Sequence, residues 1–319
     1  HADSVLPHLG RPAATADSPF AALSDAFLSD GAFIHVPAGV VVEEPFHIVY
    51  RSTGETNARR SVAEPVSASF PRALVILEEG ARATVIESFR GATGGPYLAC
   101  PVTDVWLGAD AVLDHYRIQE DGPLAYHIAA LRLRQGDRST LRSLCVTLGA
   151  RLSRLELAAD LAGHDVSCTL NGLYLADGEQ HVDSHLLVDH VGQRGRSEET
   201  YKGVLDGRSR AVFNGRIRVH PRAQQTDARQ TNRNLLLSND CRVNSNPQLE
   251  ILNDDVKCTH GSTVGQLDQY ALFYLQSRGI DREAARTMLV RAFAGDLLSG
   301  IAIGALREHL EATLAARIG

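Results

Sequence analysis

The chain has 319 residues, of which 44% are hydrophobic and 22% charged, and its formal net charge is −6. This ordinary globular balance excludes a wholly disordered chain or a fibre. A pI near 6.1 with dispersed basic residues argues against a general nucleic-acid binder, and no apolar run reaches the roughly 18 residues that would span a membrane.

Residues 1–32 predict a loose lead-in followed by one short helix. The first 17 residues are polar and rich in Pro and Ala. Ser18 and Pro19 fit an N-cap and the first helical position, and the helix should end at Gly31. The chain begins at His1 rather than Met and shows no secretory signal, so we expect that residues are missing upstream.

Residues 33–265 predict a long all-β region. After a turn at residues 36–42 and a polar loop over 51–70, short β-like runs alternate with turn residues about 14 to 15 positions apart. The turn markers are Gly80, Gly94–Gly95, Gly108, Gly122, Gly136, Gly149, Gly163, Gly178, Gly192, Gly207, Arg222, Asp240 and Asp254.

This spacing fits two architectures. One is a β-sandwich; the other is a parallel β-helix in which two units make one coil of about 28 residues. The unbroken length, the similarity of the units and the scarcity of hairpin dipeptides such as Asp206-Gly207 favour the solenoid. A left-handed hexapeptide helix is disfavoured, because no six-residue repeat is sustained.

Residues 266–319 predict a small helical domain. Asp268 and Asp281 can cap two helices, the first stopping at Gly279, and a third carries Leu306, Leu310 and Leu314. A unit of this size cannot build a strong core alone, so we expect it to pack on the β region, on a partner, or on both.

Cysteine usage indicates a reducing compartment. The five cysteines are odd in number and form no Cys-x-x-Cys pair, which disfavours a disulfide scaffold and favours a cytoplasmic protein.

Cys258 and His260 are the strongest candidate ligands. Residues i and i+2 of a strand face the same side, so this thiol and imidazole should project together and could bind a metal such as iron, copper or zinc. A tetrahedral site needs four ligands, so the others would come from elsewhere. The alternative interpretation is a buried cysteine beside a surface histidine.

A second cluster consists of His181, Asp183 and His185, which could form a metal ridge, an acid–base array or simply a solvated strand face. Facing carboxylates would suggest a polysaccharide-degrading enzyme, with candidates Asp177, Asp183, Asp189 and Asp206. The low aromatic content, 6%, weakens that alternative.

Enzyme signatures are missing from the sequence. The only two lysines, Lys202 and Lys257, lie outside any Gly-Lys-Ser or Gly-Lys-Thr context, which excludes ATP hydrolysis by a P-loop. Without a nucleophile elbow, zincin motif or dinucleotide fingerprint, the chain is expected to be a scaffold rather than an enzyme, or a purely structural solenoid.

Several segments of the sequence together form a recognisable pattern. They are NPQLEI (246–251), DDVKCTHG (254–261), TVG (263–265), LFYLQSRGI (272–280), His35-Val36-Pro37 with Gly39-Val40, His181-x-Asp183, Phe213-Asn214-Gly215 and Gln224-Gln225-Thr226. These segments closely resemble the SufB/SufD family, the scaffold subunits of the Suf iron–sulfur cluster assembly machinery. The Cys-x-His-Gly stretch is most like the D subunit, since the B subunit tends to carry Glu-His-Glu there; Thr259 replaces a frequent Ser.

The resemblance implies a right-handed parallel β-helix with a small C-terminal helical domain, and makes residues 1–32 the remnant of a helical N-terminal region. It implies a B-type partner subunit and a SufC-type ATPase docked through residues 266–319. An iron–sulfur cluster would be transient and shared with the partner at His260, the first candidate ligand, and Cys258, the second. Self-pairing of the isolated chain, a flavin and the role of the His181 cluster are left open.

Overall fold

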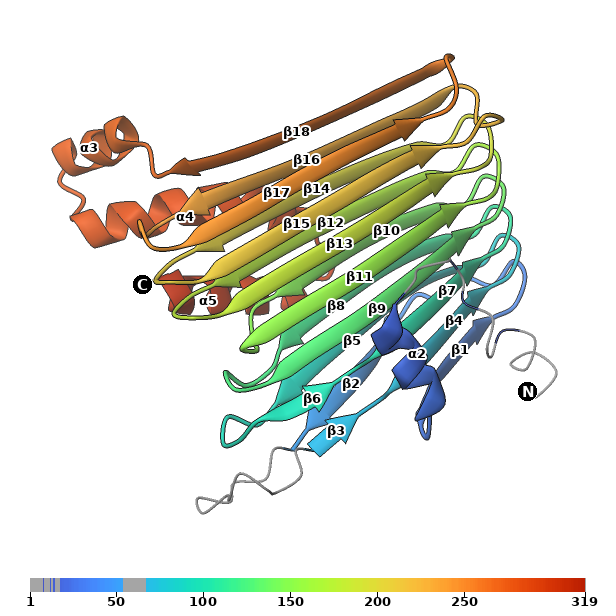
Figure 1. Cartoon of the computed structure of the whole chain (residues 1–319), viewed down its shortest axis with the longest axis horizontal. Helices are drawn as coiled ribbons and strands as arrows, with labels where there is room; N and C mark the ends of the chain where they lie inside the picture. The colour runs from blue at the N-terminus through green and yellow to red at the C-terminus, as the bar shows by residue number, and fades with distance from the viewer. Residues whose placement is uncertain (1–7, 9–11, 13, 15–17, 54–66, 319) are drawn as a thin grey trace.

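The computed structural model describes residues 8, 12, 14, 18–53 and 67–318, and these form two parallel sheets with helices on their outer faces (Figure 1). The first sheet contains β1 (Gly31–Val36), β3 (Ser67–Ser69), β4 (Arg72–Leu77), β6 (Tyr97–Ala99), β7 (Val102–Leu107), β9 (Tyr126–Gln135), β11 (Leu152–Leu161), β13 (His181–His190), β15 (Arg210–Val219) and β17 (Arg242–Ile251). The second contains β2 (Phe46–Ser52), β5 (Arg82–Gly91), β8 (Val112–Glu120), β10 (Thr140–Thr147), β12 (Ser167–Ala176), β14 (Arg196–Leu205), β16 (Thr226–Leu236) and β18 (Val256–Gln266).

The chain winds between the two sheets as a solenoid. Leu152 on β11 pairs with His181 on β13, and Ser167 on β12 pairs with Arg196 on β14, so one coil takes 29 residues in this part of the chain. The predicted solenoid of two strand–turn units per coil is therefore confirmed, and the sandwich alternative is wrong. The predicted turn markers from Gly80 to Asp254 lie at or beside the junctions between strands.

Alternating side chains give the solenoid its core. On β14, for example, Ser197, Glu199 and Tyr201 point inward and are buried. The interior is largely aliphatic, with Leu131, Leu170 and Phe213 among its fully buried members. Polar side chains also enter it, which becomes important at the C-terminal end.

Three C-terminal helices are α3 (Gln269–Ser277), α4 (Arg282–Ser299) and α5 (Gly304–Ile318). Asp268 and Asp281 cap α3 and α4 as predicted, and Gly279 follows α3 with a φ of +86°. The second and third of these helices bury Val290, Leu298 and Leu310 against the outer face of the second sheet. The predicted helical region thus packs on the β region, while the domain boundaries stay a prediction.

The N-terminal helix α2 (Pro19–Ala26) starts as predicted, with Ser18 accepting a hydrogen bond from the Ala21 amide at 3.1 Å. Its predicted end at Gly31 is wrong: the helix ends at Ala26, and Gly31 begins β1. A Cβ at Gly31 would overlap the Arg72 carbonyl, so glycine there lets β1 approach β4.

The loop predicted over residues 51–70 is partly wrong. The second strand continues to Ser52, and Ser67–Ser69 form β3, which pairs with β6. The rest of that prediction lies outside the described residues, as does most of the lead-in. Among the described helices, none has the length and hydrophobicity of a membrane span.

Candidate functional site

The candidate ligands Cys258 and His260 lie on β18, the last strand of the second sheet. The neighbouring β17 is the last strand of the first sheet, so both sheets end in the same coil. Figure 1 shows β18 along one edge of the molecule, with α3 projecting beyond it. We call the coil formed by β17 and β18 the terminal coil.

Both candidate side chains are on the inward-facing side of β18. Register pairs Cys258 with Ala228 and His260 with Gln230 on β16, and both β16 residues are buried in the interior. Cys258 is half-buried and packs against the solenoid core, whereas His260 is exposed. The exposure arises because no further described coil follows to cover them, and it leaves the two side chains open to a second molecule.

Directly below the terminal coil the interior contains a chain of polar side chains. Ser262 on β18 bonds to Ser245 on β17 at 2.8 Å, and Ser245 donates to Asn232 at 2.8 Å. Asn234 donates to the same Asn232 oxygen at 2.7 Å, and Tyr174 donates to Asn234. These bonds tie the two strands of the terminal coil to the coil beneath.

Two ionisable groups in this region are perturbed by burial. Burial raises the pKa of Glu199 to about 8, although a hydrogen bond from Gln230 opposes the shift. Burial also raises the pKa of the Cys258 thiol. Cys258 is therefore mainly a neutral thiol in the free chain, and a bound metal cation would have to favour its thiolate form.

The terminal coil offers an incomplete metal site. A thiolate and an imidazole suit iron or zinc, yet two ligands fill only half of a tetrahedral shell. Within the part of the chain that the structure describes, no three His, Cys, Asp or Glu side chains gather as a metal-binding group. The arrangement fits a ligand pair that is completed from outside the chain.

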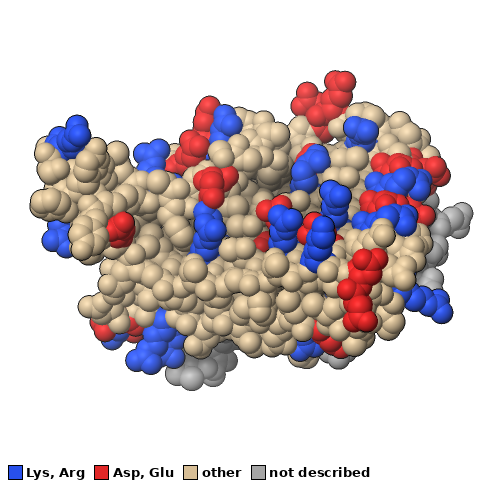
Figure 2. All heavy atoms as spheres, turned by 90° about the horizontal axis from the view of Figure 1, so that it is seen from above, with Lys and Arg blue, Asp and Glu red and all other residues tan. Residues whose placement is uncertain are grey.

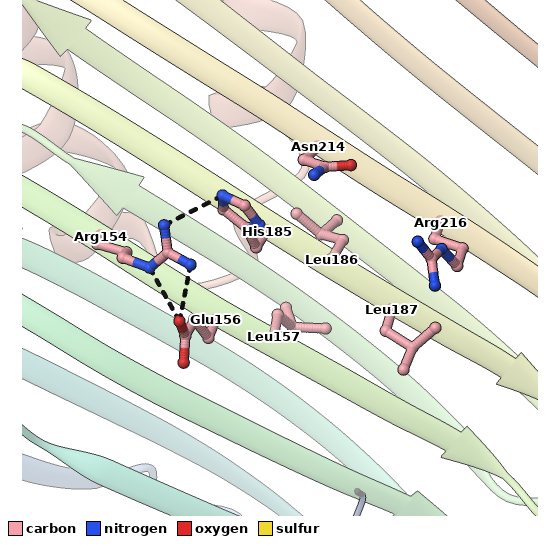
Figure 3. A pocket seen from close by; sticks show the side chains of 8 residues that line it. All are labelled: Arg154, Glu156, Leu157, His185, Leu186, Leu187, Asn214 and Arg216. Atoms are coloured by element: carbon pink, nitrogen blue, oxygen red, sulfur yellow. Dashed lines mark hydrogen bonds and ion pairs between the residues drawn. The ribbon is translucent and has the colours of Figure 1, made fainter. Parts of the chain in front are cut away.

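The second predicted cluster lies elsewhere, on the outer face of the first sheet. Asp183 contacts His185 at 2.8 Å and also pairs with Arg154, which bonds to Glu156 at 2.9 Å. Figure 3 shows Arg154, His185, Asn214 and Arg216 around a shallow surface pocket. This cluster is a charge-compensated strand face, because Arg154 bridges both carboxylates.

The carboxylates considered for polysaccharide cleavage fall into two separate places, one at a turn shared by consecutive coils and one on a strand face. Asp177 and Asp206 lie in turns, whereas Asp183 and Asp189 lie on β13. Asp189 bonds to His220 at 3.0 Å and Asp206 pairs with Arg286. Asp177 and Asp206 are neighbours at one turn, but the ion pair with Arg286 occupies Asp206. His220 likewise occupies Asp189. These contacts count against a free acid–base pair and hence against the polysaccharide-degrading alternative.

One surface was missed by sequence reasoning. The helix α3 exposes Tyr270, Phe273 and Tyr274 by 87%, 70% and 57%, and Met288 on α4 is 49% exposed. We call these four residues the aromatic patch. Figure 2 looks onto the terminal coil: basic and acidic side chains gather over one part of this face, while a broad strip beside them and the projecting end that carries α3 are largely uncharged. The density of Phe and Tyr in residues 270–274 was the available signal.

Comparison with known proteins identifies one family. The family model described as "SUF system FeS cluster assembly, SufBD core domain" matches residues 58–293. An iron–sulfur cluster assembly SufBD family protein of Synechocystis is 33% identical over 93% of this chain and 66% of its own length. The iron–sulfur cluster assembly protein SufD of Escherichia coli is 30% identical over 97% of this chain and 72% of its own length.

A chloroplastic protein of Arabidopsis thaliana, ABCI7, is 37% identical over 83% of the chain and 56% of its own length. The chain thus spans between about half and three quarters of the length of these relatives.

Proposed function

The chain belongs to the SufBD family of the SUF iron–sulfur cluster assembly system, and on that premise we propose that it is a non-catalytic, D-type scaffold subunit for cluster assembly. The cluster is its cargo, held transiently and shared with a B-type partner. We propose a cytoplasmic localisation, which agrees with the five free cysteines of the chain, because free thiols are typical of a reducing compartment.

The observation that carries this proposal is the position of Cys258 and His260. Both lie on the inward side of the terminal coil, where His260 is exposed and Cys258 is half-buried. Two soft or borderline ligands at an open end provide half of a coordination shell, and a partner that covers the end can supply the remainder.

The strand edges of the terminal coil suit a B-type partner. β17 and β18 each pair with a strand on one side, β15 and β16, and their other edges are unpaired within the described residues. Free edges present backbone N–H and C=O groups that a second parallel sheet can pair with. Such pairing would place the partner's residues beside His260.

The aromatic patch suits the ATPase. The chain carries no P-loop, so ATP hydrolysis belongs to a partner. Tyr270, Phe273 and Tyr274 offer large apolar contact area with little side-chain entropy to lose, which is typical of interface anchors. Docking there would bring the ATPase to the helix that follows β18 directly in the chain.

The test is co-purification with a B-type subunit and a SufC-type ATPase, followed by iron and sulfide analysis. We expect a stable complex, little iron on the isolated chain, and a lower cluster content with His260→Ala. Thr259→Ala, on the outward side of the same strand, is the matched control and should behave as wild type. If the complex formed with a Cys258→Ala/His260→Ala double variant held as much iron and sulfide as wild type, the proposed ligand role would be rejected. The purely structural solenoid would then be the remaining interpretation.

A further inference from the structure

Beneath His260 lies a buried amide with one unused group. Gln230 on β16 is 1% exposed, and its Nε2 donates to Glu199 Oε2 on β14. Its Oε1 is buried and has no hydrogen-bond partner, which is costly for a buried carbonyl. A buried acceptor without a donor calls for an explanation, and a donor that arrives only in another state of the molecule is one such explanation.

The register shows where such a donor can come from. His260, Gln230 and Glu199 are consecutive partners on β18, β16 and β14, and all three have the inward-facing parity. Nε2 is used toward Glu199 on β14, which leaves Oε1 as the group of this amide that a donor from β18 can still reach. His260 is the residue of β18 in register with it.

The opposite sheet holds the amide in place. A Cβ at Gly215 on β15 would lie 2.5 Å from Gln230 Nε2 and 2.7 Å from its Oε1, so the amide rests directly against that glycine. Gly215 supplies the room, and Glu199 sets which way the amide is turned. The amide is thus held by Glu199 on the strand below and by Gly215 on the opposite sheet, and β18 is the neighbouring strand that remains to supply a donor.

A metal-bound imidazole needs such an acceptor. Histidine ligands almost always donate their second ring N–H to a carbonyl or carboxylate, which fixes the tautomer and makes the ligating nitrogen more basic. In the chain as described, His260 is exposed and has no such bond, so the contact would form as its ring turns inward on binding.

We propose that Gln230 is the positioning residue for His260: its Oε1 accepts the ring N–H of the metal-bound imidazole, and Glu199 orients Gln230 through Nε2. The relay rests on the proposed role of His260 and extends it to two buried residues. Neither of them touches the cargo, and each acts through its upper neighbour.

The test uses Zn²⁺ as a diamagnetic probe of the whole chain labelled with 15N-histidine. His260→Ala identifies the His260 signals and removes the site. Gln230→Met keeps the side-chain volume without the acceptor, and Gln230→Glu restores an acceptor. Glu199→Gln keeps an acceptor for the amide, whereas Glu199→Met does not. Thermal unfolding shows that each variant is folded before titration.

We expect Zn²⁺ to bind one ring nitrogen of His260 and to leave the other as a protected N–H in a single tautomer. Gln230→Met should weaken Zn²⁺ binding at His260 by about 10-fold or more and abolish the protected N–H signal. Glu199→Gln should stay near wild type. Gln230→Glu keeps an acceptor but loses the Nε2 donor to Glu199, so it should recover the protected N–H only in part. Glu199→Met should give a mixture of His260 tautomers, as Gln230→Met does.

Wild-type affinity and tautomer in folded Gln230→Met would overturn the relay, as would a His260 signal that Zn²⁺ does not move. Complex formation with the B-type subunit and the ATPase is scored separately by co-purification. If one of these results is obtained while the complex still forms, only the relay is rejected and the proposed function stands.

Discussion

Two buried ionisable residues show how single side chains govern this solenoid. Glu199 lies fully inside it with only Gln230 as a hydrogen-bond partner, and Lys202, one of two lysines in the chain, is buried on the outer side of the same strand. Burial disfavours the charged form of Glu199, whereas Asp296 on α4 neutralises the charge of Lys202. Each makes a separate prediction.

Glu199 should make stability depend on pH. Burial raises its pKa from 4.5 to about 8, so between these values the folded state keeps a proton that the unfolded state has released. The stabilisation is complete below about pH 4.5 and is lost as the pH rises through 8. Relative to Glu199→Gln, wild type should lose up to about 1.4 kcal/mol of unfolding free energy per pH unit in this window.

Urea unfolding at pH 5, 6, 7 and 8 measures this difference. Glu198→Gln, a change at the exposed neighbour on the outward face, is the matched control and should run parallel to wild type. If the unfolding free energies of wild type and Glu199→Gln changed with pH in the same way, the raised pKa of Glu199 would be contradicted.

Lys202 should act as the tether of α4. Its Nζ donates to the Phe293 carbonyl at 2.8 Å and contacts Asp296 at 2.6 Å. Lys202→Met should lower the unfolding free energy by about 1–3 kcal/mol. Asp296→Ala should cost more, because it leaves the buried ammonium without its counter-ion, whereas Asp296 is 61% exposed and can be hydrated. The reverse order of the two effects in urea unfolding would contradict this assignment.

At the scale of elements, the turns of successive coils must stack as closely as the hydrogen-bonded strands that they connect. Glycines recur at the junctions because the backbone of the preceding coil passes close by. A Cβ at Gly163 would overlap the backbone of Gly136 and Asp137, one coil earlier, and a Cβ at Gly192 would overlap that of Gly163. Glycine is needed at these positions for close approach of two backbones.

Gly163→Ala should therefore lower the unfolding free energy by at least about 2 kcal/mol, since backbone atoms cannot move aside as a side chain can. Gly295→Ala in α4, where no atom lies within 4 Å of the added carbon, is the contrasting variant. It should be neutral or raise stability by up to about 1 kcal/mol. Equal melting temperatures for the two variants would show that turn stacking is not limiting.

These same glycines explain how much the sequence could predict. Their spacing and the caps at Asp268 and Asp281 are local signals, and they predicted the solenoid and two helices correctly. The end of α2 at Ala26 depends on β1 meeting β4 at Gly31, a contact about 40 residues apart that no local pattern records.

The candidate site divides in the same way. Cys258 and His260 share a face by strand alternation, which the sequence contains. Gln230 lies 30 positions earlier and joins them only through the coil register.

At the scale of the molecule, two surfaces at one end remain open. The terminal coil exposes strand edges and His260, and α3, which projects beyond it, carries the three aromatic residues of the aromatic patch (Figure 1). Because helices α4 and α5 already cover the second sheet, the patch is not required for that packing. It can be altered without disturbing the core.

The variant Tyr270→Ser/Phe273→Ser should keep the wild-type melting temperature, since these side chains are 87% and 70% exposed. It should weaken binding of the ATPase by about 10-fold or more, as expected for aromatic interface anchors. Val41→Ser, 59% exposed near the opposite end of the solenoid, is the matched control. Unchanged affinity in a titration of the ATPase would place its contact elsewhere.

The coil-on-coil construction also has a dynamic consequence. Each coil contacts mainly its immediate neighbours, so the solenoid behaves as a one-dimensional cooperative chain whose free energy of opening falls toward its ends. The terminal coil has one neighbour, and much of its inward face is exposed or half-buried. Amide hydrogen exchange should therefore be faster in β17 and β18 than in β11 to β14. Binding at the terminal coil would supply the missing neighbour and slow that exchange. The free energy of local opening of β17 and β18 should therefore rise when a partner binds there.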